Sequence, residues 1–175
     1  MRALKLFAAL VLAVLLHLVG TRLMPSLPLR LDVFLVIVAL QALEGVTLSA
    51  VLFGLLVGLV QDTLTSGPFG LFGFADTAVA YGMARLAQRL VIQRASGVFA
   101  VVCFASLSQQ VILAALAFLL LPNPSLPEPV AMLGQAAAKA VACGVLGMLL
   151  YAAAGRFRSA VETRRRGRMG RLRLE

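Results

Sequence analysis

Residues 58–74 read GLVQDTLTSGPFGLFGF and place an acid, a serine, two threonines, a proline and four glycines between two strongly apolar runs. The Ser-Gly-Pro sequence at 66–68 favours a turn, and Asp62 is of a residue type that accepts hydrogen bonds from the backbone amides of such a turn. Gly70 and Gly73 allow a tight entry into the next segment. The stretch therefore predicts two helices joined by a shaped turn, and a plain connecting loop is the alternative.

The composition of the whole chain indicates a membrane protein. Of its 175 residues, 61% are apolar and only 13% are charged, and the mean hydropathy is +0.98. A soluble domain of this size would need far more polar surface. We therefore expect an all-α integral membrane protein, with a transmembrane bundle over residues 1–155 and a basic cytoplasmic tail over 156–175.

Five apolar stretches predict the helices of this bundle. They lie at about 4–21, 31–60, 71–88, 97–121 and 130–154. The stretch 31–60 is too long for one upright span and too short for two full spans, and Glu44 would be costly in the middle of a bilayer. We expect a short helix on each side of a break at Gln41–Gly45. This gives a bundle of six transmembrane helices, with five as the alternative.

The distribution of basic residues orients the bundle. Half of the Lys and Arg residues, 8 of 16, fall in the tail, and the positive-inside rule places it in the cytoplasm. The same rule puts Arg85, Arg89 and Arg94 inside. The loops 61–70 and 122–129 are then outside, and six spans make both termini cytoplasmic. The tail is either a topology signal alone or a surface for anionic lipid or an acidic partner. We expect no nucleic acid partner.

Small residues at four-residue spacing predict close helix packing. Gly54 and Gly58 form one such pair, and Ala136, Ala140 and Gly144 form a second stripe on the last span. Such spacing lets two helix backbones approach closely in a membrane. Packing inside the bundle is the favoured interpretation, and a partner surface is the alternative.

The residue sets of known intramembrane enzymes are missing from the sequence. The single histidine, His17, stands alone on the first span. Asp62 and Asp76 could approach each other, but nothing beside them supports an aspartyl enzyme, which needs two carboxylates that share a proton. Cys103 and Cys143 lack the paired spacing of a zinc site, and a disulfide between them is not expected. We predict no enzymatic activity, no cofactor and no metal site.

Lys139 is the most unusual charge in the sequence, because it falls near the middle of the last span. A lysine at that depth is costly unless it is paired or wetted. At 1.5 Å per residue, Lys139 lies roughly 13 Å and Asp76 roughly 8 Å below the outer end of the bundle. We predict an ion pair between them, with Gln135 helping to satisfy the ammonium. A snorkelling side chain or a carboxylate from a ligand or partner is the alternative.

The opening stretch also carries a resemblance. The pattern Gly58-x-x-x-Asp62-x-x-x-Ser66-Gly67-x-x-Gly70-x-x-Gly73, at the exit of a middle span, resembles the MreD family of rod shape-determining proteins. The similarity extends to the length, the short basic N-terminus, the five to six spans and the basic C-terminal tail. The "QDTLTSGPFG" region is its motif-like part.

The resemblance implies a function for the chain. It implies a non-catalytic subunit of the bacterial inner membrane that belongs to the elongation machinery for peptidoglycan and supports cell shape. Its direct partner would be a single-span MreC-type protein. Through that protein it would associate with a RodA-type glycosyltransferase, a penicillin-binding transpeptidase and an MreB-like filament. The family is similar in fold to the substrate-binding S-components of energy-coupling vitamin transporters, so capture of a small molecule for transport is the alternative function.

Overall fold

The computed structural model describes residues 2–23, 31–65, 67–89, 95–120 and 129–171, and within these ranges the chain is helical without any strand. The helices are α1 (Arg2–Leu23), α3 (Val33–Ala42), α4 (Thr47–Leu64), α5 (Leu71–Arg89), α6 (Ala95–Leu120) and α7 (Pro129–Arg171). The all-α prediction is confirmed, and each predicted stretch contains the helix or helices expected of it.

Three of these helices are long and apolar enough to cross a membrane. They are Thr47–Leu64, Ala95–Leu120 and the segment Leu133–Gly155 of α7. The described helices do not provide six complete membrane spans. In particular, α3 has 10 residues and rises about 15 Å, which is about half of a bilayer's hydrocarbon core.

The short helix α3 is the centre of the bundle and contacts α1, α4, α5, α6 and α7. Its buried residues are Val33, Phe34, Leu35, Val36, Val38, Ala39 and Ala42. A helix that is apolar on all sides is expected to be enclosed by other helices. As a result, the N-cap residue Asp32 lies inside the protein, where it is only 4% exposed.

The predicted break between two short helices is confirmed. Helix α3 ends at Ala42 and α4 begins at Thr47, and between them Gly45 adopts a φ of 75°, a conformation that favours glycine. The side-chain amide of Gln88, near the end of α5, donates hydrogen bonds to the Gly45 carbonyl and to Thr47 Oγ1, both at 2.8 Å. The break and the end of α5 therefore lie at the same end of the bundle, with Glu44 exposed there.

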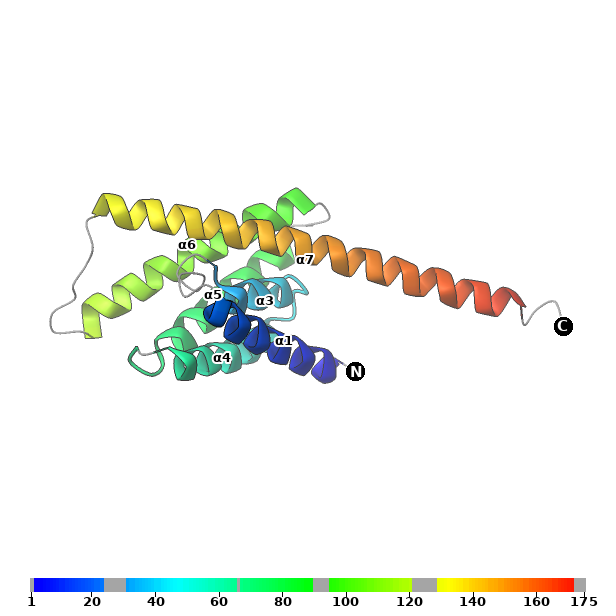
Figure 1. Cartoon of the computed structure of the whole chain (residues 1–175), viewed down its shortest axis with the longest axis horizontal. Helices are drawn as coiled ribbons and strands as arrows, with labels where there is room; N and C mark the ends of the chain where they lie inside the picture. Colours follow the sequence, from blue (N-terminus) through cyan, green and yellow to red (C-terminus); the bar gives the residue numbers. More distant parts are fainter. Residues whose placement is uncertain (1, 24–30, 66, 90–94, 121–128, 172–175) are drawn as a thin grey trace.

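The same end also holds the beginning of α1. The first turns of α1 and of α4 line one apolar groove, whose residues are Leu6, Phe7, Leu10, Val46, Leu48, Ser49, Leu52, Phe53 and Leu56. Figure 1 shows the N-terminus and the distal part of α7 extending toward one side of the molecule, with the end of α4 and the start of α5 on the opposite side. Helix α7 continues through residue 155 to Arg171, so the expected start of the tail at 156 is not a break in secondary structure.

Candidate functional site: a buried polar core

The carboxylate of Asp62 organises the turn between α4 and α5. It is buried, and it accepts hydrogen bonds from the backbone N–H groups of Gly70, Phe72 and Gly73, each at 3.0 Å. The first N–H groups of a helix have no partner within the helix, so the carboxylate supplies the acceptors that the start of α5 lacks. Gly70 has a φ of 99°, which favours glycine here. The prediction that Asp62 binds the amides of the following turn is confirmed.

The other turn residues singled out from the sequence contribute less. Ser66 lies outside the described residues. Gly67 is exposed, and a Cβ added there would meet no atom within 4 Å. Packing therefore does not require a glycine at 67.

Gly54 and Gly58 bring the backbones of α4 and α5 into contact, as predicted. A Cβ on Gly54 would lie 2.8 Å from the carbonyl oxygen of Asp76, and a Cβ on Gly58 would lie 2.5 Å from that of Phe72. Both distances are too short for a real side chain. The two glycines therefore seat α5 directly on α4, beside the turn that Asp62 holds.

The second stripe of small residues packs α7 against α6. A Cβ on Gly144 would lie 2.5 Å from Cys103 Sγ and 2.9 Å from the ring of Phe99. Ala140 is buried, and its carbonyl accepts a hydrogen bond from Cys103 Sγ at 3.3 Å. The interpretation of the stripe as internal packing is confirmed at these two positions. Cys103 and Cys143 are free thiols, so the expected absence of a disulfide between them is also confirmed.

Lys139 pairs with Asp32. Its Nζ lies 3.3 Å from Asp32 Oδ2, and the two side chains are only 10% and 3% exposed. The same oxygen accepts a hydrogen bond from Gln61 Nε2 at 3.1 Å, while Oδ1 caps α3 by accepting from the Leu35 N–H at 3.1 Å. The Asp32 N–H points to Cys143 Sγ at 3.3 Å. One carboxylate thus ties α3, α4 and α7 together.

The predicted ion pair between Lys139 and Asp76 is wrong. Asp76 is fully buried, and its Oδ1 accepts a hydrogen bond from Gln109 Nε2 at 2.6 Å. Gln135, which was expected to help, is exposed. The depth argument failed because it left out Asp32. Asp32 precedes an apolar run, and the half-length of α3 places it deep in the bundle.

Four buried oxygens in this core have no hydrogen-bond partner among the described residues. They are Gln61 Oε1, Asp76 Oδ2, Ser106 Oγ and Gln109 Oε1. The described part of the chain contains no group of three or more His, Cys, Asp or Glu side chains placed to hold a metal ion. The sequence gives no clear signal for Gln61 and Ser106, since single polar residues in apolar helices carry no distinctive spacing.

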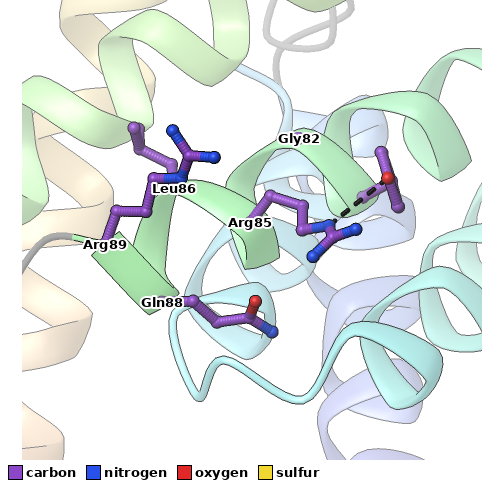
Figure 2. A pocket seen from close by; sticks show the side chains of 6 residues that line it. Gly82, Arg85, Leu86, Gln88 and Arg89 are labelled. Atoms are coloured by element: carbon purple, nitrogen blue, oxygen red, sulfur yellow. Dashed lines mark hydrogen bonds between the residues drawn. The ribbon is translucent and has the colours of Figure 1, made fainter.

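A separate, open hollow of about 470 Å³ lies along the end of α5 and is lined by Tyr81, Gly82, Arg85, Leu86, Gln88 and Arg89. The Arg85 side chain donates through Nε to the Tyr81 hydroxyl at 3.3 Å and stacks over the ring at 5.6 Å. Figure 2 shows the side chains of Arg85 and Arg89 extending in different directions. The two guanidinium groups do not converge on one point, so the hollow is a basic surface and not a site where both arginines bind the same anion.

Comparison of the chain with protein-family models, with curated proteins and with solved structures gives no match. Function is therefore argued from the geometry of the chain and from the sequence resemblance alone. In the described residues, most of the buried polar side chains connect one helix to another.

Proposed function

We propose that the chain is a non-catalytic integral membrane subunit of the MreD type, which supports cell shape and lateral peptidoglycan synthesis as part of the bacterial elongation complex. In this proposal it resides in the inner membrane with both termini in the cytoplasm. Its direct partner is a single-span MreC-type protein. A RodA-type glycosyltransferase, a penicillin-binding transpeptidase and an MreB-like filament associate through that partner.

The observation that carries the proposal is the turn held by Asp62. A carboxylate bonded to three backbone N–H groups holds the start of α5 to the end of α4, and next to it α4 and α5 touch at Gly58. The turn between them presents Phe69, which is 70% exposed. Exposed aromatic side chains on a preformed surface are typical of protein contacts. This supports a role as a contact surface for the motif that carries the resemblance.

The membrane setting has its own support. Three described helices have the length and composition of spans, and large apolar side chains are exposed along α1, α4, α6 and α7. Exposed apolar surface on this scale is unfavourable in water and is expected against lipid. The positive-inside rule assigns the end with Arg85 and Arg89 to the cytoplasm. Anionic lipid near the basic tail would add about 1 kcal/mol per basic residue.

Affinity purification of the tagged chain from mild detergent, followed by identification of bound proteins, tests the proposal. We expect an MreC-type single-span protein to co-purify. The substitution Phe69→Ala should weaken its recovery. Phe118→Ala should leave recovery unchanged, because Phe118 is equally exposed, at 69%, but lies on α6. Recovery of an ATPase module instead would replace this proposal with the transporter alternative, and equal loss in both variants would contradict a role for the turn.

A further inference from the structure

The end of the buried core between α5 and α6 contains oxygens without donors. Asp76 Oδ2, Gln109 Oε1 and Ser106 Oγ have no partner among the described residues, and all three side chains have zero exposure. Buried polar atoms are nearly always satisfied in folded proteins. These three oxygens therefore need a partner that the described residues do not supply.

Two of the three oxygens belong to side chains that are in contact, and the third lies on the same face of α6 as Gln109. The Asp76 and Gln109 side chains are in direct contact at 2.6 Å, with the amide nitrogen facing the carboxylate. Ser106 precedes Gln109 by three residues on α6, so both lie on the same buried side of that helix. Gln61 reaches the same core from α4 through its bond to Asp32, and its Oε1 is also without a partner in the part of the chain that the structure describes.

The acidic side chains of this core differ in how they are paired. Asp62 is satisfied by three N–H donors, and Asp32 has Lys139 as its counter-ion. Among the described residues Asp76 forms no ion pair, and the one bond recorded to its carboxylate comes from a neutral amide. A buried carboxylate without a counter-charge is strongly unfavourable, and an uncompensated carboxylate inside a membrane bundle often marks an ion site.

We propose that Asp76, Gln109 and Ser106 bind a single monovalent cation, with Na⁺ as the probe. Hard cations are coordinated by carboxylate, amide and hydroxyl oxygens, and these are the atoms that lack partners. A proton on Asp76 would neutralise its charge but would form a hydrogen bond to at most one of the oxygens without partners. Water would serve the lone pairs and would leave the charge unless Asp76 were also protonated, and the response to pH in the test below separates that case from a bound cation. A divalent ion would need more than the one uncompensated carboxylate present. This inference does not depend on the proposed role in cell elongation.

The test is thermal unfolding of the purified full-length chain in detergent. NaCl is titrated against choline chloride at constant ionic strength, so that only the identity of the cation changes. Because Na⁺ would bind the folded state selectively, Tm should rise saturably, by about 5 to 10 °C at a concentration 100 times Kd. Asp76→Asn should abolish the rise. Glu44→Gln, which alters an exposed acid, should retain it.

A second variant keeps the test decisive if Asp76→Asn does not fold. Ser106→Ala removes one ligand oxygen with little change in volume, and we expect it to raise the Kd for Na⁺ about tenfold, as for the loss of one hydrogen-bonding group to a charge. The proposal is overturned if the unaltered chain shows no rise specific to Na⁺, or if lowering the pH alone gives the same rise in choline. It is also overturned if Asp76→Asn folds and keeps its response to Na⁺.

Discussion

Removing the ammonium of Lys139 should destabilise the bundle sharply, and the same change should be far milder when Asp32 is neutralised as well. Lys139→Met leaves a carboxylate that is almost fully buried and retains bonds to the Leu35 N–H and to Gln61. Breaking a buried ion pair typically costs about 3 to 5 kcal/mol. The 3.3 Å distance is longer than the roughly 2.8 Å of a strong charged hydrogen bond, so we expect about 3 kcal/mol.

The partner substitution completes the cycle. Asp32→Asn keeps an oxygen to cap α3 but strands the ammonium, so it should also cost about 3 kcal/mol. The double variant leaves neither charge unpaired, and we expect a coupling energy of at least about 2 kcal/mol. The free energy of unfolding is measured by circular dichroism in mixed micelles of dodecyl maltoside and SDS. A matched cycle of Lys139→Met with Asp76→Asn should show smaller coupling. Stronger coupling of Lys139 to Asp76 than to Asp32 would refute the pairing seen in the structure.

Three further predictions address the turn, the helix contact and the topology. Asp62→Ala should lower the free energy of unfolding by roughly 2 to 4 kcal/mol, because it leaves backbone donors without an acceptor; a loss below about 0.5 kcal/mol would show that the turn does not need the carboxylate. Gly58→Ala should lower the free energy of unfolding by about 1 to 3 kcal/mol, because the added Cβ would lie 2.5 Å from a backbone oxygen. The control Gly82→Ala adds its Cβ in open space and should stabilise α5 by up to about 1 kcal/mol. Denaturant unfolding of both variants checks this, and equal effects would contradict the close contact. Reporter fusions at Pro124 and Glu175 should give opposite signals if the first lies outside and the second inside, and equal signals would remove that topology.

The Asp62 turn could be predicted from sequence because its chemistry is local. The carboxylate and the amides it binds are 8 to 11 residues apart, and glycines at the required positions are visible in the sequence. A close helix contact at Gly54 and Gly58 was indicated for the same reason, since the two glycines lie one helical turn apart, but the spacing did not identify α5 as the partner helix. These features depend on neighbouring residues and little else.

The partner of Lys139 could not be found in this way. Asp32 is separated from it by 107 residues, and its burial depends on α3 being enclosed by five other helices. An aspartate ahead of an apolar run is normally read as an interfacial residue. The useful signal was the short apolar run before the break at Gln41–Gly45. A helix of 10 residues is too short for its two ends to reach both membrane surfaces.

The long separation between Asp32 and Lys139 has a consequence for how the protein is made. At a synthesis rate of 5 to 20 residues per second, the 107 residues between them take roughly 5 to 20 seconds to emerge. During that interval the first part of the chain holds a carboxylate for which the intended counter-ion does not yet exist. We therefore expect α3 to reach its final position only when α7 is present, and a chain stopped before α7 to be recognised as unassembled and degraded.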